Sequence, residues 1–174
     1  MSMANLISNE AAGLGLPLSN GATDVLLSVL VLAGSDLALT TWEQELVTWL
    51  AEHDQTILGI GMVSFDVHEI AWTCDRFDDE KAFLLKTIDQ ALTRHRWDAL
   101  GYDPPYAHQY LSTFRTLVQA VELESIRPDS TWEWLQRPEA MVKCSRHEVY
   151  VHASGCLLCN DAPLDKTLAR TPPN

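Results

Sequence analysis

The chain has 174 residues, of which 47% are hydrophobic, and a formal net charge of −12. This length and composition suit one folded domain with a small appendage. An acidic chain repels phosphate groups, so the charge argues against DNA or RNA as a ligand.

The negative charge is concentrated in the first part of the chain. Residues 1–75 contain ten Asp and Glu and no Lys or Arg, whereas residues 76–174 contain fourteen acidic and twelve basic residues. An acidic surface keeps a protein soluble, and it also attracts a basic protein partner and speeds the encounter. The composition leaves both interpretations open.

Targeting signals are not evident. No Lys or Arg precedes Arg76, so the basic start of a signal peptide is missing. The longest apolar run, residues 25–33, is far shorter than the roughly 20 residues of a membrane span. Three of the four cysteines fall in a metal-binding pattern, which indicates a reducing compartment, and Cys74 is expected to be a buried free thiol. We expect a soluble cytoplasmic protein without a membrane partner.

The first half of the chain predicts two helices. Residues 1–20 are rich in Ser, Asn, Gly and Ala and predict a loosely ordered arm. Residues 22–33 are almost wholly apolar and predict a buried helix capped by Gly34, with a buried strand as the alternative. Thr40 and Glu43 form a capping-box pattern that predicts a helix to about His53. Its acidic residues, among them Glu45 and Glu52, are expected on the exposed faces.

Residues 57–72 have β character and predict a short hairpin or small sheet. The apolar alternation changes phase near His68 and Glu69, which predicts a bulge, a turn or a strand end there. Asp66, His68 and Glu69 form a polar cluster beside this irregularity. They suit either a general acid–base pair or a solvated strand edge.

The second half predicts further helices. Residues 78–94 form one, with Asp78 and Asp79 at the positive end of its dipole, and residues 106–123 form another after a Gly- and Pro-containing connection. A second capping-box pattern, Ser130 to Glu133, predicts a short helix that Pro138 stops. Residues 161–174 are expected to be a mobile tail. The domain itself is expected to span residues 21–140.

The clearest motif lies in residues 141–160, which we call the hook. Cys144 and His147 are separated by two residues, and after eight more residues Cys156 and Cys159 repeat this spacing. Two such turns with a Cys3His ligand set suit one Zn2+ ion. Four protein ligands leave no position for water, so the site is expected to be structural rather than catalytic. A disulfide with a spare thiol, three unrelated thiols, and His152 in place of His147 are the alternatives.

Together these patterns predict a mainly α-helical (α+β) fold, with about four core helices, a short hairpin or small sheet, and the zinc hook docked on the domain. The stretch GMVSFDVHEIAW (residues 61–72), the KAFLL run (residues 81–85) and the hook resemble small bacterial proteins of the immunity type found in toxin–immunity pairs. The resemblance implies a cytosolic protein that binds and neutralises a cognate toxin.

Charge steering suits such a role when the toxin is basic. The contact residues we expect are acids predicted to lack a basic partner, namely Glu43, Glu45, Glu52, Asp66, Glu69, Asp78 and Asp79. The alternatives are a hydrolase that uses Asp66, His68 and Glu69, and a zinc-stabilised adaptor without a toxin partner. Oligomeric state is not predicted.

Overall fold

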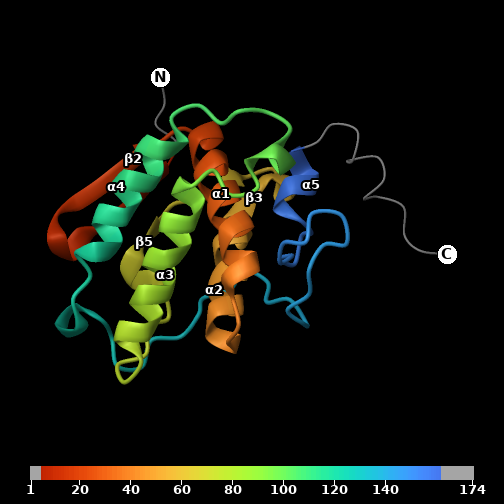
Figure 1. Cartoon of the computed structure of the whole chain (residues 1–174). Coiled ribbons are helices and arrows are strands. Elements are labelled where there is room, and N and C mark those ends of the chain that lie inside the picture. The colour runs from red at the N-terminus through yellow and green to blue at the C-terminus, as the bar shows by residue number, and fades with distance from the viewer. Residues whose placement is uncertain (1–4, 162–174) are drawn as a thin grey trace.

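The computed structural model of the chain describes residues 5–161. Its body consists of four helices, α1 (Asn20–Leu37), α2 (Thr41–Glu52), α3 (Phe77–Leu92) and α4 (Ala107–Gln119). Helix α1 contacts each of the other three, and α3 also packs on α4. Figure 1 shows α1 in the middle of this arrangement. The predicted α+β class with a helical core is confirmed.

Helix α1 is the core helix of the domain. Ser19 caps its start by accepting a hydrogen bond from the Ala22 amide, and every residue from 25 to 35 is buried. It is also the one helix among residues 5–161 that is long and apolar enough to cross a membrane, but 67% of that stretch is buried inside the protein. The run thus forms a helix rather than a strand. Gly34 does not end it, because α1 continues to Leu37.

The predicted N-terminal arm is wrong for residues 5–18. They form a β-hairpin in which β1 (Asn5–Asn9) pairs with β2 (Leu14–Leu18), and Ile7 is fully buried. The polar residues that suggested an arm are buried and bonded instead; the Asn9 amide, for example, donates to the Leu117 carbonyl. A 3-10 turn, η1 (Glu10–Ala12), joins the two strands.

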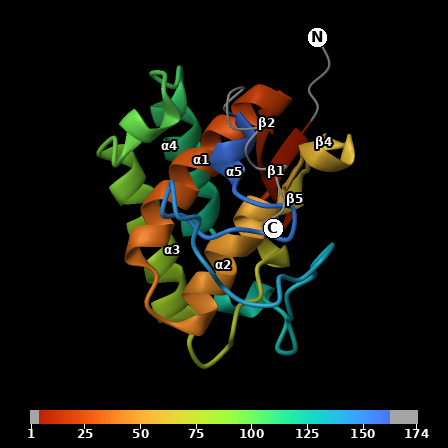
Figure 2. The same cartoon turned by 90° about the vertical axis from the view of Figure 1, so that its right-hand side faces the viewer.

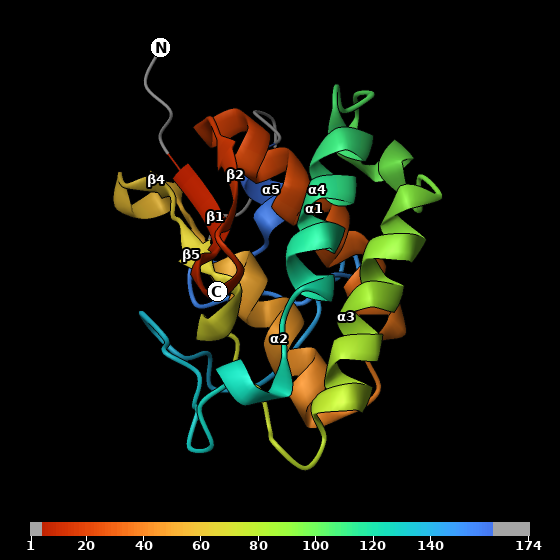
Figure 3. The ribbon, with the colours of Figure 1, turned by 90° about the vertical axis from the view of Figure 1, so that its left-hand side faces the viewer.

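Residues 54–69 form short strands, and the predicted small β element is present. β3 (Asp54–Gln55) pairs with β4 (Gly61–Met62) around a 3-10 turn, η2 (Thr56–Leu58), while β5 (Phe65–Asp66) runs parallel to β1. Figure 3 shows β1, β2 and β5 together at one side of the helices. The expected change of phase is present as a 3-10 turn, η3 (Val67–Glu69).

The connection after α4 departs from the prediction. The 3-10 turn η4 (Trp97–Leu100) lies between α3 and α4, and η5 (Leu123–Ser125) follows α4, but residues 131–134 form no helix. Instead of capping a helix, the Ser130 hydroxyl donates to the Ile70 carbonyl at 3.4 Å. Trp132 packs against Trp42 and Trp49, with ring centroids 5.8 and 5.5 Å away. These tertiary contacts take precedence over the local capping pattern.

The chain then enters the hook, which ends in α5 (Leu157–Asp161). Residues 162–174, most of the predicted tail, lie outside the described residues. Cys74 is exposed, so the expectation of a buried thiol is wrong.

Candidate metal centre and acidic cavity

The four predicted ligands of the hook come together. Cys144, His147, Cys156 and Cys159 each place one ligand atom within 4.8 Å of the others. The Cys144 and Cys159 sulfurs are 3.7 Å apart, and the His147 Nδ1 atom lies 3.3 to 3.9 Å from the three sulfurs. Around a tetrahedral zinc, bond lengths of about 2.3 Å to sulfur and 2.0 Å to nitrogen place ligand atoms about 3.5 to 3.8 Å apart. The cluster therefore has the size needed to hold one metal ion.

The backbone of both turns supports the same interpretation. The Cys144 sulfur accepts hydrogen bonds from the amides of Arg146 and His147, two and three residues later. The Cys156 sulfur accepts from the amides of Leu158 and Cys159, again two and three residues later. A thiolate is a far better acceptor than a thiol, so this repeated geometry suits deprotonated, metal-bound cysteine.

The buried sulfurs need a compensating positive charge if they are to be thiolates. Burial raises the pKa of the Cys156 and Cys159 thiols, and it lowers the pKa of His147, so two ligands would be neutral thiols at pH 7. Burial also acts to raise the pKa of Cys144, but the amide donors bring it below its ordinary value. A bound divalent cation would offset the free-energy cost of burying thiolates, because it stabilises the charged sulfurs directly.

The hook is anchored to the helical body next to α1. The Tyr150 amide donates to the Ser35 hydroxyl at 3.1 Å, and Val149 and Leu157 are fully buried. Arg96 links the same region, since its guanidinium reaches both the Asp36 carboxylate and the His147 carbonyl. Figure 2 shows α5 beside α1. Loss of the metal should therefore loosen a segment that covers part of the core.

His152 is not part of the cluster. It is buried, with its Nδ1 atom accepting from the Ser154 amide at 3.2 Å, and burial lowers its pKa. The histidine that joins the three cysteines is thus His147, as the spacing predicted.

The acids expected to lack basic partners are partly engaged inside the protein. Glu43 completes the Thr40 capping box, and Glu45 accepts from the Trp132 indole and pairs with Arg137 at 2.8 Å. Glu52 is buried and accepts from the Gln136 amide at 2.9 Å; burial raises its pKa. The prediction that these three carboxylates are exposed is wrong, because Glu52 is buried and Glu43 and Glu45 are partly buried. The prediction that they lack a basic partner is wrong for Glu45, whose partner Arg137 lies 92 positions away.

Asp66 and Glu69 line a polar cavity of about 650 Å3, which we call the acidic cavity. Its lining includes the carboxylates of Glu10, Asp66, Glu69, Asp129 and Glu133 and the guanidinium of Arg127. A hollow of about 250 Å3 on the other side of η5 is lined by Asp75, Asp78 and Asp79 together with Arg76 and Leu123. We call this the neighbouring hollow.

A chain of three hydrogen-bonded side chains borders the acidic cavity. The Asp66 Oδ1 and His68 Nδ1 atoms are 2.8 Å apart, and the His68 Nε2 and Ser125 Oγ atoms are also 2.8 Å apart. Burial alone would raise the pKa of Asp66, but hydrogen bonds from the amides of His68 and Glu10 and from two side chains hold it below its ordinary value. The sequence indicated Asp66 and His68, but Ser125 lies 57 residues from His68 and no local motif marks it.

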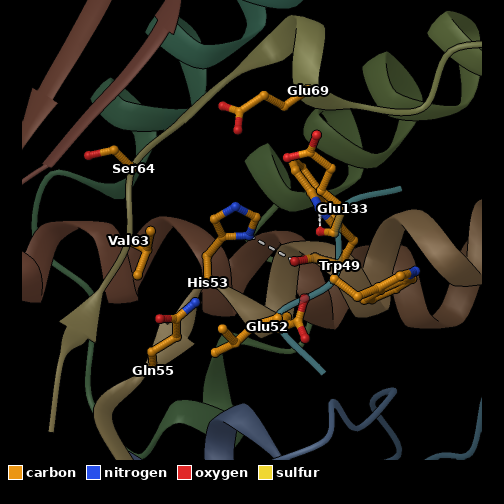
Figure 4. Close-up of a pocket in the computed structure, with 10 residues that line it drawn as sticks. Trp49, Glu52, His53, Gln55, Val63, Ser64, Glu69 and Glu133 are labelled. Atoms are coloured by element: carbon orange, nitrogen blue, oxygen red, sulfur yellow. Dashed lines mark hydrogen bonds between the residues drawn. The ribbon is translucent and has the colours of Figure 1, made fainter. Parts of the chain in front are cut away.

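A smaller cavity of about 260 Å3 shares Glu69 and Glu133 with the acidic cavity. Figure 4 shows the His53 imidazole among its lining residues, with the Nδ1 atom 2.8 Å from the Trp49 carbonyl oxygen. Burial lowers the pKa of His53 to about 4. The ring is neutral at pH 7 and packs against Trp49 and Phe65, so it serves the core.

Comparisons with known proteins do not extend these observations. The chain matches no protein-family model, no curated protein and no solved structure. The resemblance to immunity proteins therefore stays a prediction.

Proposed function

We propose that this protein is a zinc-stabilised, cytoplasmic binding protein of the immunity type, which neutralises a basic toxin by capturing it. The observation that carries the proposal is the charge around η5. The acidic cavity and the neighbouring hollow together present eight carboxylates and two guanidinium groups. Leu123 lines the hollow and Ser125 lines the cavity, so one short segment separates them.

Zinc is the metal we propose for the hook. Three thiolates and one imidazole are soft and borderline ligands in a closed tetrahedral set, which zinc prefers over calcium, magnesium or manganese. With four protein ligands the ion has no open position for substrate or water. Its role is to hold the hook against α1.

The charge near η5 fits a cationic surface better than it fits a phosphate or a membrane. An excess of carboxylates raises the local concentration of a basic partner and accelerates its association, most strongly at low ionic strength. Asp66, Glu69, Asp78 and Asp79 are the predicted contact residues that line these two features. Glu43, Glu45 and Glu52 line neither feature and are bonded inside the protein, so they are not proposed as contacts.

The test is co-expression with the toxin encoded by an adjacent gene, followed by purification of the complex. Protection of the cells and a complex whose association slows with added salt are expected. If neither protection nor a complex is found, the immunity proposal fails. A complex without protection would favour the adaptor alternative.

A matched pair of charge reversals locates the contact. Asp79 and Asp98 are both exposed and both lie in the first turn of a helix, α3 and η4 respectively. Asp79→Lys should slow association several-fold, whereas Asp98→Lys, beyond the other end of α3, should change it little. Equal effects of the two variants would show that only net charge matters and would refute the proposed surface.

A further inference from the structure

We propose that Ser125, His68 and Asp66 form a hydrolytic site in the acidic cavity, with Ser125 as the nucleophile toward an ester or amide of a cationic substrate. This activity is independent of the proposed toxin capture. It is carried by the geometry of three side chains and by the cavity that they border.

The order of the hydrogen bonds is the one that acyl transfer requires. The Ser125 Oγ atom meets His68 Nε2, and the opposite ring nitrogen, Nδ1, meets Asp66 Oδ1, each at 2.8 Å. Asp66 can hold the imidazole in the tautomer whose Nε2 atom accepts a proton, and it can stabilise the imidazolium that then forms. The same constellation serves on unrelated folds, so it is recognised by geometry rather than by sequence position.

Asp66 is itself fixed in place by two other elements. Its Oδ2 atom accepts from the Ser8 hydroxyl and from the Glu10 amide, both at 2.8 Å, and its Oδ1 atom also accepts from the His68 amide. Glu69 accepts from the Asp66 amide and completes the cap of η3. Glu69 therefore positions Asp66, and the proposed site consists of Ser125, His68 and Asp66 rather than of Asp66, His68 and Glu69.

The Ser125 hydroxyl is available to a substrate. Ser125 is exposed and lines the cavity, while His68 and Asp66 retain only 19% and 18% of their side-chain exposure. The hydroxyl has one hydrogen and two acceptors within reach, His68 Nε2 and the Glu122 carbonyl at 2.7 Å. A rotation about one bond turns the hydrogen from the carbonyl to the imidazole, which prepares the oxygen for attack.

The cavity defines the class of substrate. Glu10, Asp129 and Glu133 surround the cavity without belonging to the hydrogen-bonded chain, so a lysine-like or arginine-like group on the substrate finds opposite charge. Arg127, two residues after Ser125, is the guanidinium of the cavity lining. Its positive charge is available to stabilise a developing oxyanion.

The proposed reaction uses water as its only co-reactant. Ser125 Oγ bonds to the substrate carbonyl carbon as its proton passes to His68 Nε2, and His68 then protonates the leaving alcohol or amine when the bond to that group breaks. Water next attacks the acyl-serine and gives a proton to His68. That proton returns to Ser125 Oγ as the carboxylic acid leaves.

The experiment exposes the full-length protein to a biotinylated fluorophosphonate and maps the adduct by mass spectrometry. Hydrolysis of the p-nitrophenyl ester of an N-protected lysine is followed in parallel. The wild type and Ser112→Ala, which changes an exposed serine of α4 outside the cavity, should be labelled on Ser125 and should hydrolyse the ester.

The variants separate catalysis from structure. Ser125→Ala should lose both signals, and His68→Gln should slow both by at least about a hundredfold because the general base is gone. Circular dichroism should show both variants folded, since Ser125 is exposed and His68 lies at the surface of the cavity. Absence of labelling in the wild type, an adduct on another residue, or labelling that does not depend on His68 would overturn the proposal.

Discussion

Gly34 provides the most direct test of how α1 packs. A Cβ atom at this position would lie 2.7 Å from Val47 Cγ2 on α2 and 3.3 Å from Thr87 Cγ2 on α3. Both neighbours are buried and β-branched, so neither can turn away at low cost. Overpacking of this kind costs about 1–3 kcal/mol, and alanine recovers about 1 kcal/mol of helix propensity. We expect Gly34→Ala to lower the free energy of unfolding by up to about 2 kcal/mol.

Gly21→Ala is the matched control on the same helix. No atom lies within 4 Å of the Cβ position at Gly21, so alanine should raise the free energy of unfolding by about 0.5–1 kcal/mol. Urea unfolding followed by tryptophan fluorescence, with the slope unchanged, measures both shifts. If Gly34→Ala were as stable as Gly21→Ala, the close packing of Gly34 on α1 against Val47 on α2 would be refuted.

Two further predictions concern the hook and His53. Purified protein should carry about one zinc ion per chain by elemental analysis. Cys156→Ser should lose the zinc, and Cys74→Ser, at an exposed cysteine, should retain it. A zinc-free wild type would contradict the assignment. Because the folded-state pKa of His53, about 4, is below its unfolded value near 6.5, the unfolded state takes up the proton first, and stability falls as the pH drops from 6.5 to 4. The loss should approach about 3 kcal/mol and should be smaller in His53→Asn, as measured by urea unfolding at each pH; equal pH dependence in the two proteins would count against a buried, neutral His53.

The helices and the hook were predictable because their signals are local. The Thr40–Glu43 capping box forms as its three-residue spacing predicts, and it starts α2. The hook ligands lie within sixteen residues and need only two tight turns to meet. In these segments the local preference and the tertiary structure agree, so a reading of short patterns is sufficient.

The N-terminal hairpin and the catalytic candidate were not predictable in this way. β1 is stabilised by its pairing with β5, and the Ser8 hydroxyl donates to Asp66, 58 residues later. His68 meets Ser125 only because η5 follows α4 back to the same side of the domain. Short segments such as residues 5–18 and 122–130 gain their role from partners that no local spacing reveals.

The partners of the acidic residues also could not be predicted from local sequence patterns. Composition indicates an excess of charge but not which carboxylates are satisfied inside the fold. Glu45 meets Arg137, 92 residues later, and Glu52 meets a backbone amide of the same segment. These contacts remove Glu45 and Glu52 from the surface available to a partner. The proposal uses carboxylates near η5 instead, among which Glu69, Asp78 and Asp79 are exposed.

The metal centre and the acidic cavity should respond separately to loss of zinc. The hook contacts the domain through Ser35 and Arg96, near the C-terminal end of α1 and after the end of α3. Of the described residues that line the acidic cavity and the neighbouring hollow, none belongs to the hook. Cys156→Ser should therefore lower the unfolding temperature and increase hydrogen exchange at the amides of Tyr150 and Val151, which donate to Ser35 and to the Val142 carbonyl. At temperatures where the variant is folded, toxin association and labelling of Ser125 should remain within about twofold of the wild type. A loss of association or of labelling in the folded variant would show that zinc shapes the functional surface, and the purely structural role proposed for the metal would have to be abandoned.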